Sequence, residues 1–182
     1  MDIATGSDLT AEGWADFVKR LRYHCRGEGV HDHYTANAIF IVEERTITYG
    51  IDLDYVDDRV VLCDGDEWFS PQEYWKDLDA HGRKKLNQAM QEYSGCQFMK
   101  ASDYDQWHVL SELEDHTVTG WAEGWKYVNS HFTREAAEAF IARKKHDYRK
   151  GLRVYVDAQV YCWEFETIKN AIIEGRIGFN GE

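Results

Sequence analysis

The chain has 182 residues, and its 33 acidic and 21 basic side chains give a formal net charge of −12 at pH 7. A net charge of this size and sign opposes binding to nucleic acid and to anionic membranes, so any partner is expected to be basic. The hydrophobic fraction of 43% supplies enough apolar side chains for a folded core, which excludes wholesale disorder. The length fits one globular domain.

The sequence lacks the features of membrane-spanning and secreted proteins. No apolar run approaches the roughly 18 residues that mark a candidate membrane-spanning helix. Residues 1–14 lack the basic start and apolar stretch of a secretory signal, so we expect a cytoplasmic protein. Four widely spaced cysteines fit no disulfide framework and are expected as free thiols: Cys25, Cys63, Cys96 and Cys162.

Helices are expected where a capping residue precedes apolar side chains at helical spacing. The segment 11–25 meets this condition, with Thr10 as its cap. Pro71 begins a second helix, because Ser70 and Glu73 form a capping box around it. The other helices are expected at 82–93, at 103–115 after Ser102, from Thr133 to about His146, and in a last segment that carries Phe165, Ile168 and Ile172 and stops near Gly175.

Strands are predicted mainly in the first half of the chain. The unbroken apolar run 38–42 is typical of a strand covered on both faces, and the β-forming residues 46–49 predict a second strand. The charged residues 43–45 are interpreted as the turn of an antiparallel hairpin between them. A third strand is expected at 59–63, closed by residues 64–66.

Together these elements predict an α+β fold, with an antiparallel β-hairpin or sheet in the first half and a helix-rich second half. A strand is also expected at 152–156 within the second half. We expect residues 1–182 to form a single domain, with residues 129–176 as a C-terminal submodule.

Charge is distributed unevenly along the chain. Residues 43–79 hold twelve acidic and three basic side chains, a net charge of −9, and residues 103–123 add six acids and no Lys or Arg. Residues 134–153 reverse the sign, with seven basic and three acidic side chains, a net charge of +4. The sequence therefore predicts an electrically polarised molecule.

The acidic block admits two interpretations: a solvated surface, or a face that binds a basic partner. Aromatic residues lie among the acids, and Tyr and Trp are favoured anchors at protein interfaces, which favours partner binding. The candidate partner-binding residues are Asp52, Asp54, Asp57, Asp58, Asp64, Asp66, Glu67, Trp68 and Trp75.

An alternative centre of function is the segment 23–33, where Cys25, His31 and His33 are candidate zinc ligands. The H-x-H pattern with one cysteine lacks the paired spacing of zinc modules, and Cys25 and His24 are adjacent on a helix, about 100° apart, so they do not form a natural nucleophile–base pair. No phosphate-binding loop or other common catalytic motif occurs in the chain, so a catalytic role is disfavoured. No cofactor other than zinc is suggested. The basic segment 134–146 is expected to balance the acidic half, within the chain or across a homodimer contact, rather than to bind nucleic acid.

The stretch Ser130–Ile141, followed by Lys145–Tyr148 and Arg153–Val156, resembles a small module of accessory proteins from phages, plasmids and integrative elements. The resemblance covers about a quarter of the chain and carries over no catalytic residues. It implies a bacterial mobile-element context, in which small acidic proteins often inhibit host defence, as anti-CRISPR and antirestriction proteins do, several of them by imitating DNA. The leading hypothesis is therefore a non-enzymatic inhibitor that blocks the basic groove of a nucleic-acid-handling host protein. An enzyme or zinc-stabilised domain centred on Cys25, His31 and His33 is the alternative.

Overall fold

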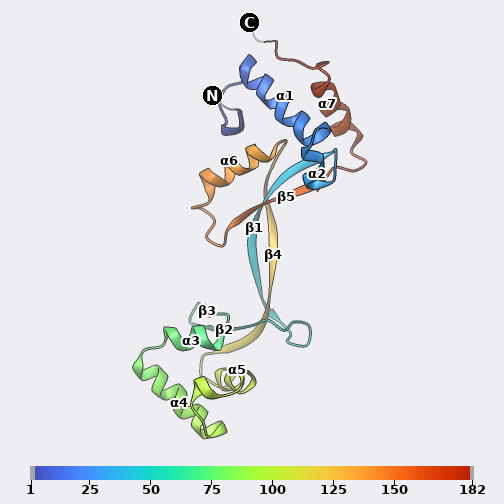
Figure 1. The fold of residues 1–182 in the computed structure, drawn as a ribbon. Coiled ribbons are helices and arrows are strands. Elements are labelled where there is room, and N and C mark those ends of the chain that lie inside the picture. The colour runs from blue at the N-terminus through green and yellow to red at the C-terminus, as the bar shows by residue number, and fades with distance from the viewer. Residues whose placement is uncertain (1–2, 181–182) are drawn as a thin grey trace. The chain divides into compact units, whose positions relative to one another are not determined.

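The structure, a computed structural model that describes residues 3–180, confirms an α+β protein with antiparallel strands (Figure 1). Five strands form a sheet in the order β3-β2-β4-β1-β5. The chain divides into two compact units, and they are described separately below. Unit 1 comprises residues up to Thr46 and from Trp125 onward, and unit 2 is Ile47–Gly124. Among residues 3–180, every helix is too short or too polar to cross a lipid bilayer.

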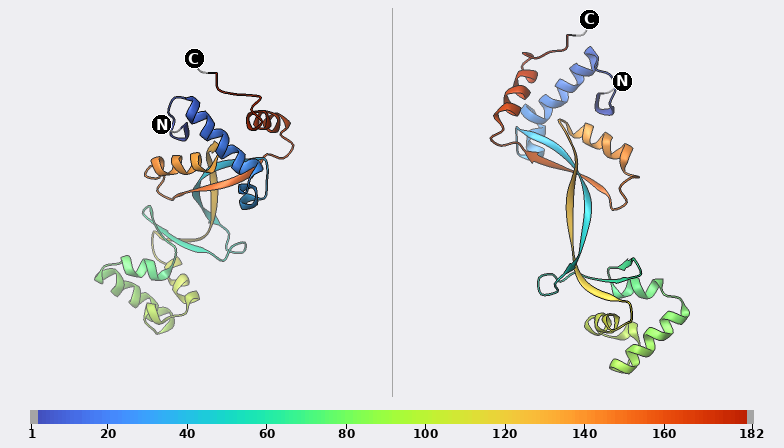
Figure 2. Two further views of the ribbon diagram at one scale, coloured as in Figure 1. Left: turned by 45° about the horizontal axis from the view of Figure 1, so that its top comes forward. Right: turned by 180° about the vertical axis from the view of Figure 1, so that it is seen from behind.

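Unit 1 combines both ends of the chain (Figures 1 and 2). Strand β1 (Ala38–Ile51) begins here and pairs antiparallel with β5 (Leu152–Ala158), so that Phe40 faces Val156 and Val42 faces Val154. The helical elements of the unit are η1 (Ile3–Thr5), α1 (Ala11–Arg26), α2 (Gly29–His33), α6 (Arg134–Lys144) and α7 (Trp163–Ile173). The segment 129–176, which we expected as a submodule, thus lies in one unit with the N-terminal residues.

Two apolar clusters stabilise unit 1. Ala38, Phe40 and Val42 project from alternate positions of β1 and pack with Ala137 of α6, as alternation along a pleated strand requires. The residues between them are half-buried, so the strand is fully covered on one face rather than on both. The second cluster joins α1 to α7 through Leu21, Cys25, Ile172 and Ile173, with the predicted stripe of Trp14, Phe17 and Val18 packed against it.

Unit 2 is built around the antiparallel strands β2 and β4. Strand β2 (Arg59–Cys63) pairs with β3 (Asp66–Trp68) on one side and with the first part of β4 (Thr117–His131) on the other. The helices are α3 (Pro71–Asp77), α4 (Ala80–Ser94), η2 (Phe98–Lys100) and α5 (Asp103–Ser111). Their shared core contains Val61, Tyr74, Leu86, Met90, Phe98, Trp107, Val109 and Leu110.

The capping signals predicted the helix starts correctly. The side chains of Thr10, Ser70, Ser102 and Thr133 each accept a backbone N–H from the first turn of the following helix. At Ser70 the capping box is modified, because the carboxylate of Glu73 accepts from the N–H of Phe69. At the other end of the chain, α7 stops before Gly175, whose φ of 76° lies in the left-handed region.

The predicted hairpin at 38–49 was wrong, because β1 runs without interruption from Ala38 to Ile51. The segment 43–45 lacks the Gly, Asn or Pro that a tight turn favours. Inside the strand, the carboxylate of Glu43 accepts a hydrogen bond from Arg153 of β5 at 2.8 Å, so an ion pair across strands explains the charge. Sequence reasoning also missed β4, whose glycines and scattered charges interrupt an alternating pattern.

The Thr133 cap gives a direct test of local stability. Thr133 is buried, its hydroxyl accepts the N–H of Ala136 at 3.4 Å, and Arg20 donates to the same hydroxyl at 3.5 Å. We expect Thr133→Ala to lower the free energy of unfolding by about 1–2 kcal/mol, measured by chemical denaturation. Ser130→Ala, at an exposed position nearby, should leave stability unchanged, and equal losses for both variants would contradict the capping role.

Candidate acidic partner-binding surface

The division into units also separates the charge. Unit 2 contains 17 acidic and 6 basic residues, a net charge of −11, whereas unit 1 contains 16 acidic and 15 basic residues, a net charge of −1. Glu43 and Glu44, which belong to the acidic block in the sequence, lie in unit 1. The excess negative charge of the protein is therefore a property of unit 2.

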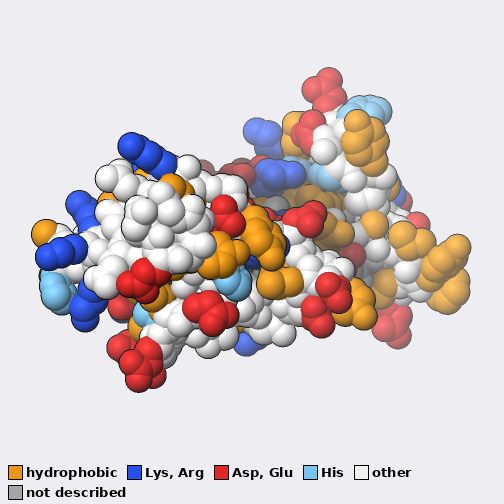
Figure 3. All heavy atoms as spheres, turned by 90° about the horizontal axis from the view of Figure 1, so that it is seen from below, with side chains coloured by type: hydrophobic (Ala, Val, Ile, Leu, Met, Phe, Trp, Pro, Cys, Tyr) orange, Lys and Arg blue, Asp and Glu red, His pale blue; other side chains and the backbone are white. Residues whose placement is uncertain are grey.

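Charge is uneven within unit 2 as well. Residues 76–100, which include α4 and η2, contain five of its six basic residues: Lys76, Arg83, Lys84, Lys85 and Lys100. The rest of the unit holds 14 acidic residues with Arg59 as its single basic residue, a net charge of −13. On the face shown in Figure 3, acidic side chains are spread along the surface, and many Lys and Arg side chains lie toward one end.

The loop between β1 and β2 carries the first acidic group: Asp52, Asp54, Asp57 and Asp58, all exposed. The side chain of Asp52 orders the loop by accepting the N–H of Asp54 at 2.9 Å, and its backbone carbonyl accepts the N–H of Tyr55 at 3.0 Å. The loop is held to β4 at its other end, where the carbonyl of Asp58 accepts the N–H of Trp121 at 3.1 Å. The four carboxylates are thus presented by an ordered turn.

The second acidic group lies at the opposite end of β2. Asp64 and Gly65 both have positive φ, as a tight hairpin turn requires, and place Asp64 and Asp66 on exposed positions beside Cys63. Burial raises the pKa of the Cys63 thiol, and the negative charges of Asp64, Asp115 and Asp66 raise it further. Asp115, from the turn between α5 and β4, therefore belongs to this group, although sequence reasoning did not select it.

A shallow groove of about 250 Å³ lies near the first acidic group in unit 2. Its lining residues come from the acidic loop, β2, α5 and β4: Leu53, Arg59, Tyr104, Trp107, His108, Ser111 and Val118. Leu53 and Tyr104 are exposed, and Tyr55 in the same loop has 84% of its surface exposed. These residues provide apolar contact area next to the carboxylates, as protein interfaces commonly do.

Three of the selected residues also have roles in the fold of unit 2. The carboxylate of Glu67 accepts a hydrogen bond from Tyr49, and burial together with this contact raises the pKa of Tyr49 to about 12. Trp68 is half-buried and donates to Asp77 at 3.1 Å. Trp75, also half-buried, stacks on Phe98 at 5.8 Å between ring centroids. The two tryptophans are thus largely occupied by the core, and Leu53, Tyr55 and Tyr104 are the more accessible apolar contacts.

The structure does not assemble the candidate zinc ligands into one site. Cys25 is 1% exposed in the α1–α7 core, whereas His31 is exposed on the short helix α2. Among residues 3–180, no group of three or more His, Cys, Asp or Glu side chains is placed to hold a metal ion. Burial also raises the pKa of the Cys25 thiol, which disfavours the thiolate that a nucleophile or a zinc ligand requires.

His33 instead packs in the interior of unit 1 with His24, their ring centroids 5.9 Å apart, and both rings contact Phe40. His24 is buried, and its Nε2 lies 3.1 Å from the carboxylate of Glu135. The pKa of His33 is lowered by burial, then by His24 and Arg134, although Asp32 opposes the shift. Burial likewise lowers the pKa of His131, with Arg143 contributing.

These shifts predict acid sensitivity of unit 1. A histidine whose pKa is lower in the folded state binds fewer protons than in the unfolded state, so stability is present above the unfolded pKa of about 6.5 and is lost as the pH falls below it. We expect the free energy of unfolding to decrease between about pH 6.5 and 5, and His33→Gln to make that decrease shallower. Denaturation at several pH values checks this, with exposed His31→Gln as the control. An identical slope in the His33 variant and the wild type would contradict it.

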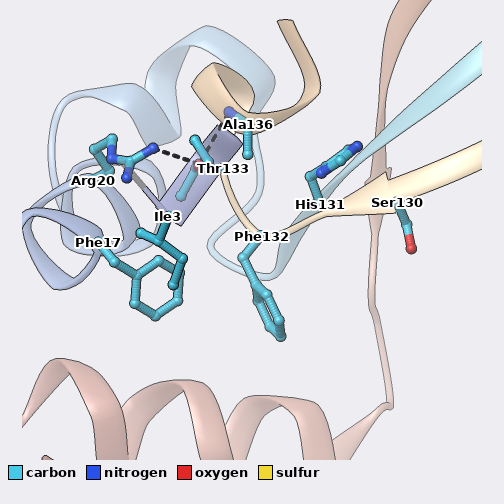
Figure 4. Close-up of a pocket in the computed structure, with 9 residues that line it drawn as sticks. Ile3, Phe17, Arg20, Ser130, His131, Phe132, Thr133 and Ala136 are labelled. Atoms are coloured by element: carbon cyan, nitrogen blue, oxygen red, sulfur yellow. Dashed lines mark hydrogen bonds between the residues drawn. The ribbon is translucent and has the colours of Figure 1, made fainter. Parts of the chain in front are cut away.

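Unit 1 also contains a hollow of about 300 Å³ at the start of α6 (Figure 4). Its apolar wall includes Phe17 and Phe132, which meet edge to face with ring centroids 6.0 Å apart. Its polar wall is formed by Arg20 and Thr133, which contact each other and cap α6. The polar groups of this hollow are therefore engaged in the fold.

The fold and surface together define a two-unit α+β protein with one near-neutral and one strongly acidic unit. No protein-family model matches the chain, and the curated proteins and solved structures contain no significant match to it.

Proposed function

We propose that the protein is a non-enzymatic inhibitor whose acidic unit 2 docks onto the basic nucleic-acid-binding surface of a partner protein. The observation that carries the proposal is the separation of charge, with −11 on unit 2 and −1 on unit 1. A protein that used acidity only for solubility would gain as much from charge spread over both units. Concentrated charge instead steers one surface toward a partner of opposite sign.

The arrangement of the acids supports imitation of a nucleic-acid backbone. One group lies before β2 and the other after it, so the intervening residues 59–63 separate Asp58 from Asp64 by roughly 20 Å at about 3.3 Å per residue. Each group contributes at least three carboxylates. A basic groove that holds duplex DNA meets one phosphate charge per roughly 1.7 Å of helix axis and therefore offers cations over such a length.

The context proposed for this activity is interference with host defence. The segments that resemble mobile-element accessory proteins, 130–141, 145–148 and 153–156, lie in unit 1. The anti-CRISPR or antirestriction role that this resemblance implies requires a partner with a basic nucleic-acid channel. Unit 2 has the complementary charge.

The decisive experiment captures partners from a bacterial lysate with the full chain and then measures inhibition. The captured protein should bind nucleic acid, and the chain should reduce that binding in a fluorescence-anisotropy competition at about 0.1 M salt. Capture should decrease sharply at about 0.5 M salt, because ions screen charges separated by more than a few ångströms. A captured partner whose nucleic-acid binding is unchanged by the chain, or whose capture is indifferent to salt, would refute the proposal.

A further inference from the structure

The helix α7 of unit 1 has two contrasting faces. Its inner face packs on α1 through Ile172 and Ile173, and Lys169 on that side is buried and donates to the carbonyl of Ala36 at 2.7 Å. On its outer side, Trp163 is 70% and Ile168 is 53% exposed. The sequence pattern gave Ile168 with Phe165 and Ile172 as the apolar residues of this helix, yet Ile168 points to solvent.

The turn before α7 extends this apolar surface. Val160 is 60% exposed and Tyr161 is 80% exposed, with the Tyr161 ring 6.2 Å from the ring of Trp163. Tyr161 has a φ of 64°, a conformation that bulky residues rarely adopt and that costs energy. A strained turn that presents an aromatic ring to water contributes nothing to the core of unit 1, which indicates that the ring has another contact.

We propose that this outer surface of α7, defined by Val160, Tyr161, Trp163 and Ile168, is a homodimer interface that binds a second copy of the chain. The four side chains expose on the order of 450 Å² in each copy, given about 150–250 Å² for a whole aromatic side chain. A standard interface covers about 800 Å² per partner, with a polar rim around an apolar core. The patch therefore supplies the core, and the neighbouring polar residues supply the rim.

The shape of the surface suits contact with its own copy. A shallow groove of about 410 Å³ runs along the outer side of α7, lined by Trp163, Glu164, Thr167 and Ile168. The projecting ring of Tyr161 lies beside this groove, so a two-fold axis allows each copy to insert its ring into the groove of the other. Such an isologous contact closes on itself and adds no further copies.

The charges around the patch select an antiparallel pairing of the two α7 helices. Glu164 and Glu166 lie in the first turn of α7. At the other end, Arg26 and Arg176 both bind Glu174, at 2.6 and 2.8 Å, which leaves one net positive charge there. An antiparallel arrangement places the acidic end of one helix against the basic end of the other, whereas a parallel arrangement opposes like charges. Unit 1 as a whole has a net charge of only −1, so two copies meet there with little repulsion.

Sedimentation velocity of the full chain tests the proposal, with no partner present. We expect a monomer–dimer equilibrium at concentrations on the order of 1–100 μM, persisting at about 0.5 M salt because the contact is mainly apolar. Tyr161→Ser combined with Trp163→Ser should weaken dimerisation about 100-fold or more, since buried aromatic anchors dominate interface energies. Tyr55→Ser, an equally exposed tyrosine in unit 2, is the matched control and should leave dimerisation unchanged. Circular dichroism verifies that each variant is folded.

A charge exchange tests the antiparallel geometry. Glu164→Arg with Glu166→Arg should weaken dimerisation, and adding Arg176→Glu should restore part of it. A parallel dimer would respond in the opposite direction, because the first change would remove repulsion between like charges. A wild-type chain that is monomeric at about 100 μM, or a dimer that is insensitive to the Tyr161 and Trp163 changes, would overturn the interface. Because dimerisation is measured without the basic partner, its result is independent of the proposed inhibition.

Discussion

Replacing Asp52, Asp54, Asp57 and Asp58 together with asparagine is expected to slow association with a basic partner by about 10- to 100-fold at low salt. These four exposed carboxylates form the densest part of the acidic surface, so they contribute strongly to long-range attraction. Asparagine keeps a side-chain oxygen, so position 52 still accepts the N–H of residue 54 and the loop keeps its conformation. Stopped-flow or surface-immobilised binding to the captured partner measures the association rate.

The control removes the same amount of charge from unit 1. Amide substitutions at the exposed residues Asp8, Glu12, Asp32 and Glu138 change the net charge equally. If net charge alone governs binding, both variants will slow association to the same extent, and the assignment to unit 2 fails. If the loop docks directly, its variant will be the slower of the two, and the difference will decrease as salt rises.

Substituting Gly120 with alanine is expected to destabilise unit 2 by about 1–3 kcal/mol. A Cβ at position 120 would lie 2.4 Å from Val56 Cγ2 and 2.5 Å from the carbonyl oxygen of Ile51. Gly120 is not in the left-handed region, so the cost is steric and not conformational. Because Ile51 and Val56 flank the acidic loop, relief of the clash must displace that loop. Chemical denaturation measures the loss, and partner binding should weaken at the same time.

The Gly120 prediction has two internal checks. Val56→Ala removes one of the two close contacts, so adding it to Gly120→Ala should recover part of the lost stability, while the clash with the Ile51 carbonyl remains. Gly178→Ala, where nothing lies within 4 Å of the added methyl group, should change neither stability nor binding. A Gly120→Ala protein as stable as the wild type would show that the loop yields without cost.

Local signals explain which elements could be predicted from sequence. The caps at Thr10, Ser70, Ser102 and Thr133 are formed by residues three positions apart, so their chemistry is complete in a short segment. The strand 59–63 was likewise predicted with its correct bounds, since an apolar run there ends at an Asp-Gly turn. The α+β class and the antiparallel strands followed from these local elements.

Errors arose where a distant segment decides the structure. The charges at 43–45 indicated a turn, but pairing of Glu43 with Arg153, 110 residues away in sequence, keeps them within β1. The alternation of β4 is hidden by Gly120, which is required there because Val56 approaches closely. Trp68 and Trp75 were selected as interface anchors, whereas their packing on Tyr74 and Phe98 makes them part of the core of unit 2.

The sequence by itself therefore determined the helix caps, the fold class and the existence of an acidic block. The tertiary structure decided where that block ends, because β1 and β4 each contribute residues to both units and the boundary falls inside them, at Thr46 and Gly124. It also decided that Ile168 faces solvent and that His33 lies with His24 near Phe40. The physical reason is range. Caps and turns are formed between neighbours in the chain, whereas burial and the grouping of charge depend on which remote segments pack together.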